Sequence, residues 1–234
     1  MTDHLPVYVP AVFLTAVFFT VAVFWLAVLR TTADEKLKRI IIAIVPLWML
    51  IQAGFAISGL YQTEPHEIPL LIFLGPLPAL IFFGILFATA RSSLISDLPL
   101  KLLTIIHVVR IPVELVLHWL YEGRLVPEAM TFSGANFDIL SGLTAALILF
   151  LAFRGGTVNR VVLVAWNIAA LLLVLTIVTI AILSFPGPLQ QLSPELPNRA
   201  VALFPYIWLP SVIVPIVIFS HAASLYKLLT NNLK

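Results

Sequence analysis

The chain has 234 residues, of which 61% are hydrophobic and 10% are charged, and its mean hydropathy is +1.09. A soluble domain carries roughly 25% charged residues and must still expose about a quarter to a third of its unfolded surface, so this composition excludes a soluble enzyme, a nucleic-acid-binding protein and a disordered regulator. The net charge is only +2, and the lack of cysteine excludes disulfides, thiolate metal sites and cysteine nucleophiles. The composition predicts an all-α integral membrane protein.

Seven apolar windows are long enough to cross a bilayer as helices, which takes about 20 residues each. The connectors between them are short, so residues 1–234 are expected to form a single seven-helix transmembrane domain. The fifth window is the shortest and is compatible with a re-entrant or partly buried loop. In chain order the windows are 5–29, 40–60, 68–90, 98–121, 137–153, 161–184 and 201–229.

Basic residues are sorted unevenly between the two sides of these windows. With the amino terminus outside, ten of the thirteen Lys and Arg residues lie on the inner side, two lie outside, and Arg110 lies within a window. The positive-inside rule therefore predicts an outside N-terminus and a cytoplasmic C-terminus, and we expect the chain in the plasma (inner) membrane. The ten inner residues are Arg30, Lys36, Lys38, Arg39, Arg91, Lys101, Arg154, Arg160, Lys227 and Lys234.

Prolines interrupt several of the windows. A proline removes a helix hydrogen bond and bends the helix, and in lipid the freed carbonyl oxygen needs a partner inside the bundle. We expect several proline-kinked helices, whose kinks either shape the packing or act as hinges beside a ligand. The prolines within windows are Pro46, Pro76, Pro78, Pro112, Pro205, Pro210 and Pro215.

The fourth window, 98–121, carries the strongest chemical signal because it has charges near its middle. An ionised side chain there costs about 2.5–3.5 kcal/mol on insertion scales, so Arg110 and Glu114 are expected to face the bundle interior. Their i, i+4 spacing lets them pair, either as a structural ion pair or as a functional site. At 100° per residue, five titratable side chains of this window share an arc of about 80°. They are His107, Arg110, Glu114, His118 and Tyr121.

Other windows supply polar groups at matching depths. Asn167 and His221 are expected near the inner side with His107, and Asp138 is expected near the outer side with His118. If the helices are neighbours, these groups form a polar column across most of the membrane. The fourth and fifth windows are expected to be adjacent because their connection is short.

The connector 123–136 leads directly into the fifth window. Ser133, Asn136 and Asp138 are residue types that cap helix N-termini, which is the simplest role for them. The alternative is a lid over the outer mouth of the polar column, in which Glu122, Ser133 and Asn136 lie near a ligand.

Seven windows with an outside N-terminus resemble the topology of the rhodopsins, but Lys227 lies at the inner end of the last window, where it is too near the cytoplasm to bind retinal. The seven-helix zinc hydrolases need clustered histidines, and the last window offers only His221. Small sugar carriers of the SWEET type have a Pro-Gln signature that is absent here. No family resemblance reaches the level of residues.

Together these features favour a transporter or proton-coupled pathway for a small polar or anionic solute. Arg110 would attract an anion or stabilise Glu114, while Glu114 and the histidines would exchange protons. One alternative is an intramembrane enzyme, or a haem- or metal-binding protein that uses His107, His118 and His221. A second is a receptor or structural membrane subunit. The expected partners are the lipid bilayer and a small polar or anionic ligand, and no cofactor, metal site or oligomeric state is predicted.

Overall fold

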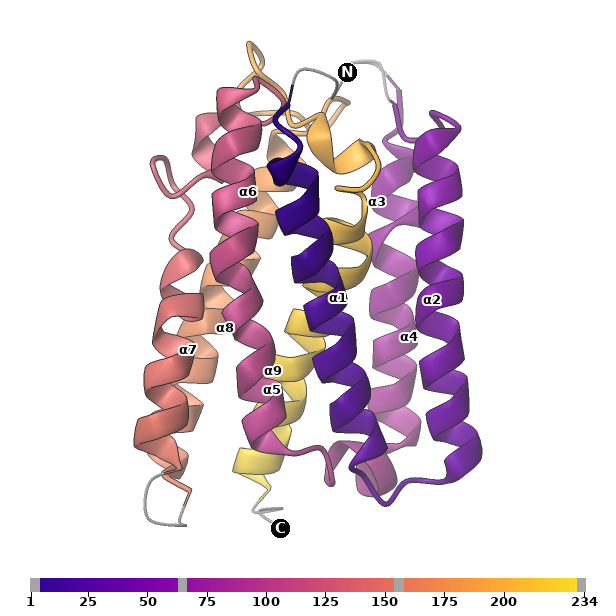
Figure 1. Ribbon diagram of the computed structural model, residues 1–234, viewed down its shortest axis with the longest axis vertical. Helices are drawn as coiled ribbons and strands as arrows, with labels where there is room; N and C mark the ends of the chain where they lie inside the picture. The colour runs from indigo at the N-terminus through magenta and orange to yellow at the C-terminus, as the bar shows by residue number, and fades with distance from the viewer. Residues whose placement is uncertain (1–4, 63–66, 154–157, 231–234) are drawn as a thin grey trace.

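A computed structural model describes residues 5–62, 67–153 and 158–230, and this part of the chain is all-α. Arg154 and Lys234, which entered the charge count, lie outside the described residues. Figure 1 shows a bundle of helices in which α1 begins at one end and α9 finishes at the other. The helices are α1 (Tyr8–Leu29), α2 (Glu35–Ile57), α3 (Leu70–Leu74), α4 (Pro76–Thr89), α5 (Leu100–Ile106), α6 (Arg110–Glu122), α7 (Ile139–Ala152), α8 (Arg160–Leu183) and α9 (Val214–Leu229).

Five helical segments of the described chain are long and apolar enough to cross a membrane. They coincide with the first, second, third, sixth and seventh predicted windows, and their length and composition indicate an integral membrane protein. The second begins at residue 35, earlier than predicted, because the Asp34 carboxylate caps it by accepting from the Lys36 and Leu37 N–H groups. The seventh begins at residue 209 rather than 201, after an irregular stretch. The five segments are Tyr8–Leu29, Glu35–Ile57, Leu70–Thr89, Arg160–Leu183 and Leu209–Leu229.

The other two predicted windows are helical but do not meet these criteria, so the described chain has five such segments and not seven. The fifth window is α7, whose 14 residues extend about 21 Å, less than the roughly 30 Å of a hydrocarbon core. The fourth window is divided into α5, a 3₁₀ turn η2 (His107–Val109) and α6. Pro112 explains this division, because it has no N–H for the Val108 carbonyl and its ring crowds that carbonyl.

Side chains from α2 satisfy carbonyl groups that prolines leave without a helical partner. The Leu74 oxygen, at the break between α3 and α4, accepts from Gln52 Nε2 at 2.9 Å. The Ser211 oxygen, in the π-helical segment η6 (Leu209–Ile213), accepts from Trp48 Nε1 at 3.0 Å. The fourth residue after each carbonyl is a proline, so neither can receive the usual backbone bond. The predicted need for such partners inside the bundle is therefore confirmed at these two carbonyls.

Gln52 also joins α2 to the segment that follows it. Its Oε1 accepts from the Tyr61 hydroxyl at 2.8 Å, and both side chains are fully buried. Burial raises the pKa of Tyr61 to about 12, against the opposing effect of this hydrogen bond, so the hydroxyl keeps its proton and remains a donor. One buried amide thus connects three segments.

The line formed by α5, η2 and α6 lies at the centre of the bundle (Figure 1). α1 packs along both α5 and α6 on one side, and α7 packs against the same line on another. α9 contacts α5 and also packs against α8. The expected adjacency of the fourth and fifth windows is confirmed, and the seventh window also reaches the fourth. The titratable face of the central line therefore turns toward the other helices of the bundle.

We expect Gln52→Leu to lower the thermal unfolding midpoint in detergent by about 2–14 °C. The change removes two buried hydrogen bonds, and each is worth about 0.6–1.7 kcal/mol in a membrane protein, where 1 kcal/mol moves the midpoint of a chain this size by about 2–4 °C. Gln191→Leu, at an exposed position, is the matched control and should leave the midpoint unchanged. Equal midpoints for Gln52→Leu and Gln191→Leu would contradict a stabilising role for the two hydrogen bonds of Gln52.

Candidate functional site

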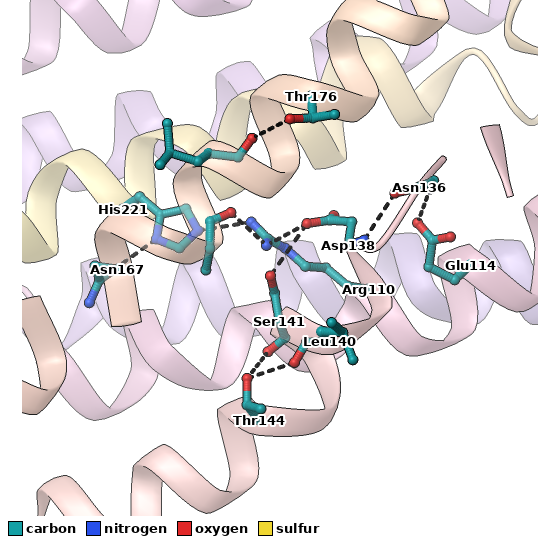
Figure 2. Close-up of polar contacts among 12 residues, drawn as sticks. Arg110, Glu114, Asn136, Asp138, Leu140, Ser141, Thr144, Asn167, Thr176 and His221 are labelled. Atoms are coloured by element: carbon teal, nitrogen blue, oxygen red, sulfur yellow. Dashed lines mark hydrogen bonds and ion pairs between the residues drawn. The ribbon is translucent and has the colours of Figure 1, made fainter. Parts of the chain in front are cut away.

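Arg110, the first residue of α6, is the centre of a buried polar cluster (Figure 2). Its side chain is 3% exposed and meets groups from three other helical segments. Nη1 donates to Asp138 Oδ1 at 2.7 Å and to the Ala170 oxygen of α8 at 3.0 Å. Nη2 lies 2.8 Å from His221 Nε2 of α9. The guanidinium therefore links α6 to α8, α9 and the start of α7.

These contacts define the state of His221. Because arginine has only donors, His221 Nε2 must accept, so the imidazole is neutral and carries its proton on Nδ1. Nδ1 then donates to Asn167 Oδ1 at 2.8 Å. Asn167 Nδ2 in turn donates to the Leu163 oxygen, which orients the amide. The chain of donors runs in one direction from Arg110 to the backbone of α8.

The ion pair of Arg110 differs from the predicted one. The carboxylate that pairs with it belongs to Asp138, not to Glu114. Glu114, one turn further along α6, accepts instead from Asn136 Nδ2 at 2.6 Å. Asn136 Oδ1 in turn accepts from the Asp138 backbone N–H at 3.0 Å, so one amide connects the two carboxylate-bearing residues.

Asp138 occupies the N-cap position of α7, but its carboxylate makes no capping hydrogen bond. The capping role predicted for it is therefore wrong: the carboxylate accepts from Arg110 and, at 3.4 Å, from the Ser141 hydroxyl. Asn136 is also not a helix cap, because its side chain bridges the carboxylate of Glu114 and the backbone at Asp138. Sequence reasoning favoured capping because these residue types directly precede a helix.

The depth of Asp138 also differs from the prediction. Figure 1 shows α7 beginning well below the end of the bundle at which α6 finishes, so its first residues lie beside Arg110. Gly142 permits this approach, because a Cβ there would lie 2.8 Å from Ile111 Cγ1 and 3.0 Å from the Ile111 nitrogen. Sequence reasoning missed Gly142. The available signal was a small residue one helical turn after Asp138.

His107 lies directly beside the cluster, in η2. It is fully buried and its ring stacks on that of His221, with centroids 3.9 Å apart and planes at 19°. The rings of His107 and Trp166 pack in a T-shaped arrangement, with centroids 5.3 Å apart. Neither ring nitrogen of His107 has a hydrogen-bond partner in the described chain. The predicted inner group of His107, Asn167 and His221 is thus brought together.

The outer half of the predicted stripe does not join this cluster. His118 is partly exposed, its Nε2 lies 3.7 Å from Glu122 Oε1, and its ring contacts that of Phe132. Tyr121 is half-buried and Ser133 is exposed. His118 and Tyr121 lie further along α6 than the level at which α7 meets it, and in the described chain no hydrogen bond joins them to the Arg110 cluster.

The histidines that the structure describes are not arranged as a metal site. Among the residues that the structure describes, no group of three or more His, Asp or Glu side chains could hold a metal ion. Both nitrogens of His221 are already used, one by Arg110 and one by Asn167. The rings of His107 and His221 lie face to face.

A cavity of about 120 Å³ adjoins the cluster. Arg110, Glu114 and Asp138 line it, as does Asn198 from the connector between α8 and η6; the other lining residues are apolar. Three of these polar side chains keep one buried atom without a hydrogen-bond partner in the described chain: Arg110 Nε, Glu114 Oε2 and Asn198 Oδ1. The arrangement can therefore offer a donor and acceptors to a guest. Nothing in the sequence pattern indicated Asn198.

Comparison with known proteins places this site within a recognised family. Residues 68–229 match the family described as a domain of unknown function, DUF8737. The chain belongs to that family. No curated protein and no solved structure matches the chain. All residues of the Arg110 cluster and of the cavity lining fall inside the matched range, whereas α1 and α2 lie before it.

We expect Gly142→Ala to destabilise the protein, because the new methyl group would contact Ile111 and push α7 away from Arg110. Gly84→Ala is the matched control: its methyl group meets nothing within 4 Å, so the higher helix propensity of alanine should leave stability equal or slightly higher. Thermal unfolding of the two variants in detergent measures the difference. A Gly142→Ala protein as stable as Gly84→Ala would contradict the close packing.

The Arg110–Asp138 ion pair predicts that the stability losses caused by substituting its two residues are strongly non-additive. Asp138→Asn leaves a buried guanidinium without its counter-charge, which costs about 3–5 kcal/mol, whereas replacing both partners by apolar residues removes the charge altogether. Thermal midpoints should therefore fall more for Asp138→Asn than for the double variant Arg110→Met/Asp138→Leu. Glu122→Gln, an exposed carboxylate-to-amide change, is the control. If the double variant loses the sum of what Arg110→Met and Asp138→Leu lose singly, the residues are not coupled.

Proposed function

We propose that this chain is a membrane carrier that moves a small anionic solute together with a proton through the Arg110 cluster. The observation that carries the proposal is the position of Arg110 and Glu114. Both are buried, both line the same cavity, and each keeps one polar atom free of protein partners in the described chain. Ionisable groups inside membrane helices mark solute and proton pathways more often than structural positions.

The charges in the cluster favour coupling between an anion and a proton. Arg110 and Asp138 cancel each other at 2.7 Å, so an ionised Glu114 would leave a net negative charge in surroundings of low dielectric. A monoanion that enters would add a second negative charge, so in the proposal Glu114 takes up one proton as the solute binds and releases it when the solute leaves. The charge of the site is then the same with and without solute. This count supports electroneutral transport of one proton per monoanion.

Breaks in the helices around the cavity support transport over a purely structural role. The 3₁₀ turn η2 directly precedes Arg110, α7 begins beside it, and the π-helical segment η6 lines the same cavity. Transporters commonly build their binding sites from such discontinuous helices, whose ends supply polar groups at the middle of the membrane. The same breaks offer hinges for alternating access.

We also propose that all seven predicted windows lie within the membrane as one domain, with the N-terminus outside and the C-terminus cytoplasmic, in the plasma (inner) membrane. The split of basic residues, ten against two, supports this orientation. In the proposal α5, η2 and α6 form one crossing at the centre of the bundle. The fifth crossing is completed by the connector before α7, whose residues Thr131 and Asn136 are buried.

The two alternative functions have less support. A haem- or metal-binding role would need free imidazole nitrogens directed at one point, and His221 has none. A receptor or structural subunit would account for the ion pair. It would not by itself require a cavity beside Glu114.

Proteoliposomes that contain a pH-sensitive dye test the proposal. Lactate, pyruvate, benzoate and octanoate, each added outside, should acidify the interior faster than in protein-free liposomes for at least one solute. Arg110→Gln should lower that solute's flux at least about tenfold, which corresponds to roughly 1.4 kcal/mol of lost stabilisation. Glu114→Gln should uncouple proton movement from the remaining flux.

Arg124→Gln and Glu122→Gln are the matched controls, because both residues are exposed and lie outside the cavity. Both should transport like the original protein. The proposal fails if no solute gives protein-dependent acidification, or if Arg110→Gln and Glu114→Gln leave every flux unchanged while folding normally.

A further inference from the structure

The residues that line the cavity indicate which class of solute fits it. We propose that the site binds an amphiphilic monocarboxylate, whose apolar body occupies the cavity and whose carboxylate reaches Arg110. This inference rests on the proposed function, because it names the class of anion that the carrier would take.

The cavity is almost entirely apolar away from the cluster. Nineteen of its 23 lining residues are apolar, and they come mainly from α3, α6, α8 and the segment from η6 into α9. A solute that is polar all over would give up its hydration against these walls without gaining hydrogen bonds. A hydrocarbon body would instead be stabilised by burial there.

The polar end of the cavity fits a single carboxylate. Arg110 Nε is a buried donor with no partner in the described chain, and guanidinium N–H groups form strong hydrogen bonds to carboxylate oxygens. Glu114 Oε2, four residues along the same helix, is the second unpartnered atom. When protonated it donates to the other carboxylate oxygen. The arrangement therefore pairs one head group with one proton.

The length of the cavity indicates an elongated body. The α8 residues that line it run from Val174 to Ile182. These two positions are eight residues apart, which corresponds to about 12 Å along the helix. A short acid such as acetate would fill only the polar end of this space.

The rim of the cavity suggests entry from the lipid. Its partly exposed lining residues include apolar side chains of three segments: Ile72 in α3, Val178 and Ile182 on α8, and Leu209 and Pro210 in η6. A rim without charged side chains suits a solute that partitions into the bilayer before it binds. The carboxylate then meets Arg110 in the interior.

Photolabelling of the full chain in nanodiscs tests this inference. The probe is decanoic acid with a diazirine in its chain, and the labelled peptides are identified by mass spectrometry. Labelling should occur on lining segments of α6 or α8, and unlabelled decanoate should compete with it. Methyl decanoate and acetate should each compete at least tenfold more weakly, because the first lacks the charge and the second lacks the body.

Cavity-filling variants provide the second arm of the test. Ala181→Phe, which places a ring in the cavity wall, should reduce labelling at least tenfold. Ala169→Phe makes the same change on an exposed face of α8 and should label normally. Val178→Phe, at the partly exposed rim, serves as a second blocking variant if Ala181→Phe does not fold.

The outcomes separate this inference from the proposed function. Acetate that competes as well as decanoate, or a folded blocking variant that labels normally, overturns the inference and leaves small-anion transport standing. Competed labelling that a folded blocking variant reduces at least tenfold supports the inference. If Arg110→Gln and Glu114→Gln then have unaltered fluxes, the binding site stands and the transport proposal falls.

Discussion

The arrangement of this bundle depends on keeping one guanidinium ionised in a nearly dry interior. Arginine cannot lose its charge there by deprotonation, so Arg110 needs acceptors from its surroundings. The structure supplies three chemically different ones: the carboxylate of Asp138, the backbone carbonyl of Ala170 and the imidazole of His221. Because these groups belong to three separate segments, satisfying Arg110 brings α7, α8 and α9 around the central helix.

The same physical requirement governs the backbone. Proline removes hydrogen bonds from the helices around the cavity, and side chains of α2 replace the missing partners, as Gln52 does for Leu74 and Trp48 does for Ser211. In lipid such replacements are obligatory, because no water can serve instead. The bundle can therefore contain broken helices without leaving these carbonyls unpaired.

Part of the polar cluster is fully hydrogen-bonded, and part of it is not. Asp138, Asn136, His221 and Asn167 form a connected set of hydrogen bonds, whereas Arg110 Nε and Glu114 Oε2 have no partner in the described chain and belong to residues that line the cavity. A cluster that served packing alone would be expected to satisfy these atoms as well, because unpaired buried polar groups cost about 1–3 kcal/mol each. This asymmetry is the physical basis of the proposed function.

The sequence by itself indicated the membrane class, the five helical segments long and apolar enough to cross a bilayer, the burial of Arg110 and Glu114, and the grouping of His107 with Asn167 and His221. Composition and helical periodicity report how apolar a segment is and which face of it is polar, and these properties follow from the order of residues alone. Only the tertiary structure decided that Asp138 neutralises Arg110 and that an apolar cavity lies beside the pair. Periodicity does not report how deep a broken helix begins, and α7 starts at the level of Arg110 because Gly142 lets two backbones approach. The cavity is formed by segments far apart in the chain, so no local pattern contains it.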